Sequence, residues 1–336
     1  MRAPHPRQLC ALGFGTLSVS AVLMLPRAGW LWATAGALAV ALLIAFCCRL
    51  RRGCAAPVRL LSECAGGRLL LVLVYAGNLL LLGASAARLC DAYPSAGARP
   101  LIGLLLLLMA AYAAGKGTPA VGRVAAIGFF FLAALYAVVL AFGAAQAEVR
   151  WLKPVTELSP ARLTALLAPV SAALLAVRCD AKCRLWTWLT GSVALVFAAA
   201  FVTAGVVSPA VASREPFAFY LMSKNVSLFG AMERLEPLVS AALTVGGFAL
   251  LGQFCAINTE IAGALAPSFR YSPAVNFLLG SGAIWLSVCL SERLLAWLSA
   301  IFWGLIPLMA LLLVAGKKRE KKSENPKKSV DKPGNW

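Results

Sequence analysis

The chain has 336 residues, of which 61% are hydrophobic and only 13% are charged, and its mean hydropathy is +0.83. Soluble domains carry about 25% charged residues, so a water-soluble fold is excluded and lipid must solvate most side chains. The net charge of +18 does not indicate nucleic-acid binding, because the basic residues lie between apolar runs and in the C-terminal tail, where orientation signals lie.

The apolar runs are continuous rather than alternating, and they have the length that a helix needs to cross a bilayer. We therefore predict an all-α membrane protein with about ten transmembrane helices. With the N-terminus inside, the inner segments hold twice as many lysines and arginines as the outer loops, which predicts that both termini are cytoplasmic. The expected spans are 9–25, 30–48, 69–87, 101–114, 124–145, 162–177, 185–207, 235–257, 273–290 and 294–315.

The C-terminal segment 317–336 is rich in Lys, Glu, Ser and Pro. It cannot bury a core, so we expect a basic, disordered cytoplasmic tail after a transmembrane domain at 1–316. The longest outer connection, 208–234, is of the kind that is usually functional or faces a partner. The single histidine, His5, lies near the N-terminus, and no glycine-rich phosphate loop occurs. We therefore expect no enzyme, no cofactor and no metal site.

Several short sequences occur in a defined order relative to the expected spans. They are AAYAAGKG at 110–117 with Gly122 and Arg123, EVRWLKP at 148–154, REPF at 214–217 and ERLE at 233–236. Together they resemble the spore germination permease family, the B subunit of germinant receptors, in the amino acid–polyamine–organocation superfamily. The resemblance implies two inverted five-helix repeats, about 7–147 and 161–316. It also implies a small amino-acid-like ligand, A and C subunits as partners, and the spore inner membrane as location.

In such folds the first helix of each repeat is broken near the middle of the membrane, and its freed backbone groups hold the ligand. The first span contains two glycines, which weaken a helix by about 1 kcal/mol each relative to alanine. Pro169 removes a backbone donor at a corresponding depth of the sixth span. Close helix packing and an ordinary proline kink are the alternatives. The candidate backbone ligands are Gly13, Phe14, Gly15, Thr16, Ala168 and Pro169.

Few side chains within the expected spans are polar. The superfamily resemblance implies that the first, third, sixth and eighth helices line the pocket. Tyr75 and Asn78 share a face of the third span because they are three residues apart, and Thr244 lies in the eighth. These three are the candidate side-chain ligands. Interhelical hydrogen bonding, at about 0.6 kcal/mol per bond, is the competing interpretation.

Charged residues near the ends of spans are candidates for a gate or a partner surface. Arg123 begins the fifth span and is either a snorkelling anchor or a fixed cation near an inner gate. Glu233, Arg234 and Glu236 lie at the outer mouth, where they cap a helix, pair with each other or dock a partner.

Three functions remain open. The first is nutrient sensing as a germinant receptor subunit, and the second is amino-acid transport by the same fold. Transport is disfavoured because no expected span carries a carboxylate at its middle, where proton relays of transporters lie. The sixth span also lacks the Gly- and Glu-containing pattern that members of the family commonly carry. The third function is a structural scaffold with a vestigial pocket.

Overall fold

The computed structural model describes most of the central part of the chain, and every regular element among its described residues is a helix. The described residues are 57–63, 66–93, 99–152, 185–208, 217–225, 236–266 and 273–290, with isolated positions between 8 and 46 and between 211 and 316. The expected spans 9–25, 30–48, 162–177 and 294–315 lie wholly or largely outside these residues.

The other six expected spans are helices in the structure. These are α4 (Gly67–Ala92), α5 (Arg99–Gly115), α6 (Thr118–Ala145), α8 (Leu185–Val206), α11 (Glu236–Leu265) and α12 (Pro273–Cys289). Among the described residues, Gly67–Ala92, Thr118–Ala145 and Pro237–Leu265 are long and apolar enough to cross a membrane. The chain is therefore helical and suited to a membrane, as predicted. Three short elements were not predicted: α3 (Pro57–Ser62), the 3-10 helix η2 (Val149–Trp151) and α10 (Ala218–Asn225).

The two largest differences from the boundaries expected from hydropathy are at α6 and α11. Helix α6 begins at Thr118 rather than at 124, because Pro119 is tolerated in the first turn of a helix. Gly117 precedes it with φ of 94°, a conformation that favours glycine and that ends α5 sharply. Helix α11 continues to Leu265 rather than ending at 257, so that it includes polar residues the hydropathy profile had placed in a loop.

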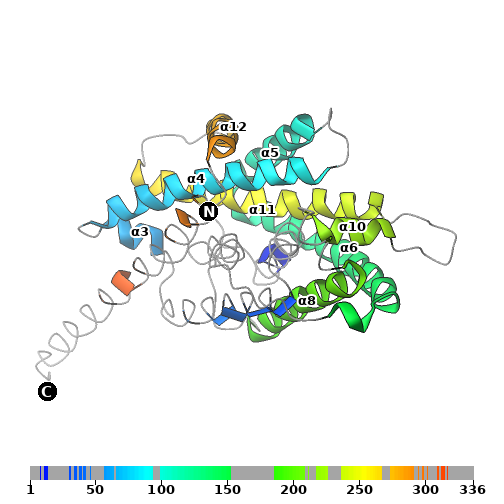
Figure 1. Cartoon of the computed structure of the whole chain (residues 1–336). Helices are drawn as coiled ribbons and strands as arrows, with labels where there is room; N and C mark the ends of the chain where they lie inside the picture. Colours follow the sequence, from blue (N-terminus) through cyan, green and yellow to red (C-terminus); the bar gives the residue numbers. More distant parts are fainter. Residues whose placement is uncertain are drawn as a thin grey trace, which may run out of the picture.

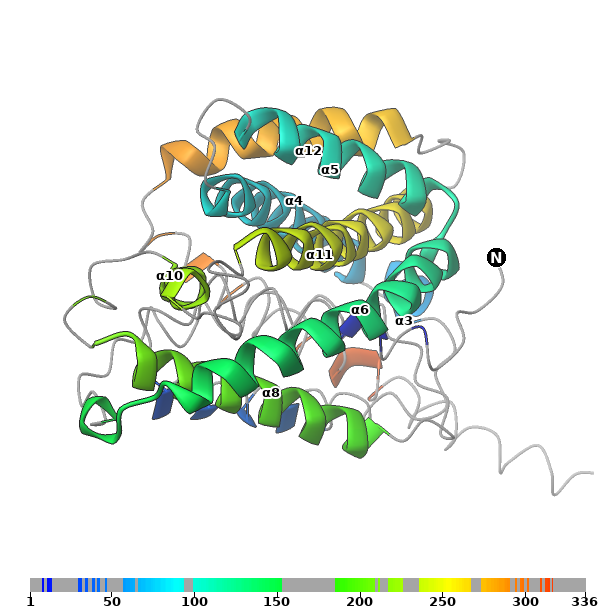
Figure 2. The ribbon, with the colours of Figure 1, turned by 90° about the vertical axis from the view of Figure 1, so that its right-hand side faces the viewer.

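The helices form three layers, which Figure 2 shows as α5 with α12, then α4 with α11, then α6 with α8. Figure 1 shows α11 alongside α4 in the middle of the molecule. Most of α11 is buried. Its leucine, phenylalanine, alanine and valine side chains belong to one continuous core together with those of α4, α5 and α6. Because α11 is buried on most sides, its apolar residues are spread around the helix and are not confined to one face.

Paired contacts give the directions of the helices around α11. Asn78 of α4 bonds to Asn258 of α11, and Tyr93, just after the end of α4, bonds to Thr244 of α11. The two helices are therefore antiparallel, because residue numbers rise along α4 in the direction in which they fall along α11. Helix α6 is antiparallel to α11 as well, because Thr118 contacts Glu260 and Gly128 packs on Val245 further along. The N-termini of α4 and α6 and the C-terminus of α11 therefore lie at the same side of the bundle.

The segment 145–152, which follows α6 in the chain, packs against the C-terminal end of α8. The Glu148 amide donates to the Gly205 carbonyl at 2.8 Å, and Arg150 forms an ion pair with Glu148. Trp30 donates from Nε1 to the Leu152 carbonyl at 3.1 Å. Both α6 and α8 thus end at one side, and residues 148–152 contribute to their junction.

Large apolar side chains face outward from several helices. A surface of this kind is unusual for a soluble monomer and is what lipid contact requires. The clearest examples come from α5, α6 and α12, and they are Leu101, Leu105, Met109, Ile127, Phe130, Leu278 and Trp285. The exposed apolar faces support the membrane assignment independently of helix length.

Candidate functional site

A buried amide pair joins α4 to α11. Asn78 donates from Nδ2 to the Phe254 carbonyl at 2.9 Å and also to Oδ1 of Asn258. Both asparagines are 0% exposed. The carbonyl fixes which end of the Asn78 amide carries the nitrogen, and that nitrogen in turn fixes the orientation of Asn258. In this pair, therefore, Asn78 is the donor and Asn258 is the acceptor, and the hydrogen bond lies in an apolar core.

A second amide, from α12, contacts α11 one residue after Asn258. Asn276 of α12, 1% exposed, donates from Nδ2 to the Thr259 hydroxyl at 3.0 Å and to the Cys255 carbonyl at 3.3 Å. The Thr259 hydroxyl donates in turn to the Cys255 carbonyl at 2.8 Å. Helix α12 is thus held to α11 by a small network that neighbours the Asn78–Asn258 pair.

A carboxylate completes the set. The Thr118 hydroxyl, at the first residue of α6, donates to Oε1 of Glu260 at 2.9 Å. Thr118 is buried and Glu260 is half-buried. The carboxylate lies near the start of α6, where the helix dipole favours negative charge. Sequence reasoning missed Glu260 and Asn258, because the expected span ended at 257. A signal that the helix extends further was available, since no glycine or proline follows Ile257 until Gly263.

Three consecutive residues of α11 each form a side-chain hydrogen bond to a different helix, and we call these three hydrogen bonds the ties of α11. Consecutive residues of an α-helix project about 100° apart. Asn258 therefore meets α4, Thr259 meets α12 and Glu260 meets α6. One turn of α11 fixes the position of three neighbouring helices, which makes it the polar centre of the described bundle.

Three atoms of the amides have no hydrogen-bond partner among the described residues. They are Oδ1 of Asn78, Nδ2 of Asn258 and Oδ1 of Asn276. Buried polar atoms are paired in the great majority of native structures, so each exception requires a physical reason. The site thus presents two acceptors and one donor that the helix ties do not use.

The predicted side-chain ligands are only partly brought together. Asn78 is at the amide pair, and Tyr75 is half-buried against the core one turn away. Thr244 is exposed, accepts from the Tyr93 hydroxyl at 2.7 Å and donates to the Ser240 carbonyl. Along α11 it lies roughly 20 Å from the level of Asn258, from a rise of 1.5 Å per residue. Thr244 and Asn78 therefore do not share one site.

The other predicted positions have simpler outcomes. Gly13 is helical, whereas Phe14, Gly15, Thr16, Ala168 and Pro169, with Glu233 and Arg234, lie outside the described residues. Arg123 is exposed, and its Nε reaches back to the Pro119 carbonyl, which suits a snorkelling anchor. Helix α11 begins at Glu236, as expected for an acidic residue at a helix start.

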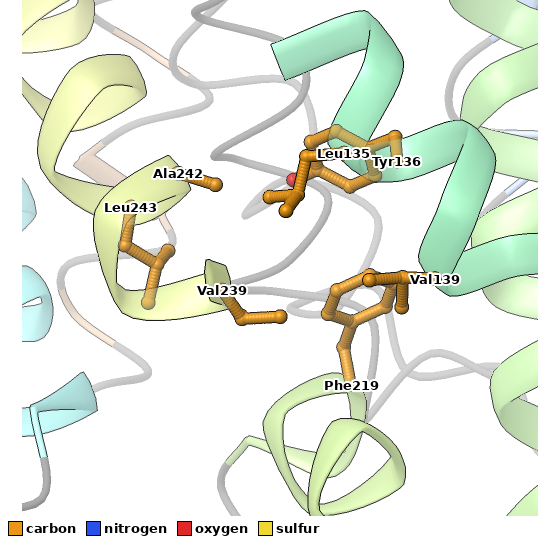
Figure 3. A pocket seen from close by; sticks show the side chains of 7 residues that line it. All are labelled: Leu135, Tyr136, Val139, Phe219, Val239, Ala242 and Leu243. Carbon is orange, nitrogen blue, oxygen red and sulfur yellow. The ribbon is translucent and has the colours of Figure 1, made fainter. Parts of the chain in front are cut away.

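The space between α6, α10 and α11 is lined almost entirely by apolar side chains (Figure 3). It contains no room for a water molecule. Figure 3 shows that Phe219 of α10 and Tyr136 of α6 lie across from Val239 and Leu243 of α11. The packing here closes this part of the bundle, so the polar groups of α11 are the better candidate site.

The described residues form an all-helical protein with three helices long and apolar enough to cross a membrane, and the polar centre lies on the most buried of these three. They contain no cluster of three His, Cys, Asp or Glu side chains that could hold a metal ion. No family model matches the chain, and no curated protein matches it.

Proposed function

We propose that the chain is a permease-like membrane subunit that binds a small amino-acid-like nutrient and signals its presence, as the resemblance to the spore germination family implies. One observation carries the proposal. Helices α4 and α11, the expected third and eighth spans, lie side by side and are joined inside the bundle by Asn78 and Asn258. These are two of the helices that the resemblance implies around a ligand.

A receptor of this kind works by a shift in conformational equilibrium. A ligand favours one state only as far as it binds that state more tightly. The three ties of α11 offer a discrete arrangement to bias, because a rotation of α11 would disturb Asn258, Thr259 and Glu260 together. Under this proposal, the A and C subunits bind the two states of the chain differently, and so respond to the position of α11 and its neighbours.

The proposal is tested by ligand-dependent stability. The purified chain, in lipid nanodiscs, is heated with each of the common amino acids at increasing concentration. A ligand that binds only the folded state stabilises it by about 2.7 kcal/mol at a hundred times its Kd. We expect one or a few amino acids to raise Tm, and the Asn78→Leu/Asn258→Leu variant to lose the response.

The matched control is Gly263→Ala, because Gly263 is an exposed residue of α11 with open space where the added methyl group would lie. It should keep the ligand response. If no amino acid raises the Tm of the wild-type chain, the binding proposal is wrong, and the scaffold hypothesis takes its place.

Transport is the second candidate, and Glu260 is the observation that favours it. The carboxylate lies within the candidate span Pro237–Leu265, near its C-terminal end rather than at the middle, where the expected spans carry no acid. A partly buried acid in a membrane helix is a functional candidate by default. Uptake of labelled amino acids into vesicles that contain this chain alone, driven by an imposed pH gradient, would support transport. Glu260→Gln should then abolish the effect of the gradient while binding persists.

A further inference from the structure

The unpartnered atoms of the amide cluster form a complementary set. Asn78 and Asn276 each present an oxygen that can accept, and Asn258 presents an N–H that can donate. All three side chains are 0–1% exposed, so bulk water does not satisfy them. A bound molecule that donates two hydrogen bonds and accepts one would satisfy these three atoms.

The orientation of the amides excludes a cation. Two amide oxygens alone would suit a monovalent ion. The Asn258 nitrogen, however, is fixed in place, because its Oδ1 faces the Asn78 nitrogen, which is itself held by the Phe254 carbonyl. A cation at the amide oxygens cannot accept a hydrogen bond from the Asn258 N–H group, which would stay without a partner. A neutral guest with both donors and acceptors has no such conflict.

We propose that this cluster is a binding site for an ordered buried water. The water accepts from Nδ2 of Asn258 and donates to the unpartnered amide oxygens, so that the contact of α4 with α11 is partly water-mediated. Buried waters typically make about three hydrogen bonds to polar groups that are otherwise unsatisfied. Such a bridge is nearly as favourable in enthalpy as a direct hydrogen bond. The water is proposed for the chain without nutrient, so its test does not require that the nutrient be known.

Phe254 is a natural reporter for this water. It is 1% exposed, and its side chain shares a helix face with that of Asn258, four residues later. Phe219 is equally buried but lines the apolar space between α6, α10 and α11. The two phenylalanines therefore differ in their polar surroundings and not in their exposure to bulk solvent.

Short X-ray pulses produce hydroxyl radicals from water wherever it lies, and mass spectrometry then locates the modified side chains. The full-length protein in nanodiscs, in ¹⁸O-labelled water, is the sample. We expect Phe254 to be modified several-fold faster than Phe219. The Asn78→Leu/Asn258→Leu variant should lose the modification of Phe254 and leave Phe219 unchanged.

Equal protection of Phe254 and Phe219 in the wild-type chain would overturn the proposal, and so would modification of Phe254 that persists in the double variant. The wild-type comparison stands by itself if the double variant does not fold. A density map of the wild-type chain that resolves waters gives a second test, with a peak within hydrogen-bond distance of Asn258 Nδ2 and Asn78 Oδ1 expected.

Discussion

The amide pair between α4 and α11 predicts a strong energetic coupling between Asn78 and Asn258. Asn78→Leu removes two donated hydrogen bonds, each worth about 0.6 kcal/mol between membrane helices. It also leaves the side-chain Oδ1 of Asn258 buried without a partner, at about 1–3 kcal/mol. The single substitution should therefore lower the free energy of unfolding by about 2–4 kcal/mol.

The double substitution should be milder than the sum of its parts. Replacement of both polar partners by apolar groups of similar shape is nearly neutral, whereas removal of one partner leaves an unsatisfied group. With Asn258→Leu as the second single variant, the sum of the two single effects should exceed the effect of Asn78→Leu/Asn258→Leu. We expect a difference of about 1–3 kcal/mol, in the upper part of the range of about 0.5–3 kcal/mol for residues in direct contact, because both amides are fully buried.

The measurement is reversible unfolding of the purified chain in mixed micelles with increasing sodium dodecyl sulfate. The Tyr93–Thr244 contact is the matched control, because it joins the same two helices while Thr244 is exposed and has a second partner in the Ser240 carbonyl. Coupling there should be near the lower end of the range for contacting residues, about 0.5 kcal/mol, because Thr244 is exposed and keeps its bond to Ser240. Additive effects at Asn78 and Asn258 would refute the reasoning from buried amides.

Two further predictions concern packing and pH. Gly83→Ala should destabilise the fold by about 1–3 kcal/mol, because a side chain there would collide with the backbone of Ala283. Gly263→Ala should stabilise the fold, because alanine favours a helix and the space around Gly263 is open. Thermal unfolding compares the two variants. Burial raises the pKa of Tyr93, just beyond α4, above its ordinary value of 10.0. The unfolded tyrosine therefore ionises first, so stability should be lost as the pH rises above 10, and Tyr93→Phe should reduce that loss in unfolding titrations.

Hydropathy located the helices well where their residues are uniformly apolar. The expected spans 69–87, 101–114 and 185–207 coincide with α4, α5 and α8 to within a few residues at most ends. Continuous apolar runs leave little choice, because lipid exposure requires a helix of this length. The sequence contained no comparable signal for α10, whose 8 residues are held by contacts with α6, α8 and α11.

The site was harder to predict, for a physical reason. Residues 258–260 are polar, so a hydropathy criterion ends the span before them. They belong to the helix because Asn78, Asn276 and Thr118 satisfy them from other helices. Those partners lie far away in sequence, and a single sequence does not reveal which pairs meet. Asn78 was therefore a candidate by its polarity, whereas its partner Asn258 was not.

The order of polar residues on α11 has a consequence for motion. Asn258, Thr259 and Glu260 each bond a different helix, so a rotation of α11 by one residue, about 100°, would break all three ties and turn each group towards a different neighbour. Small rotations are opposed from three sides, because packed cores are bistable rather than continuously deformable. Any change of state that involves α11 must therefore proceed by helices moving with it, or by exchange of all three ties in one step.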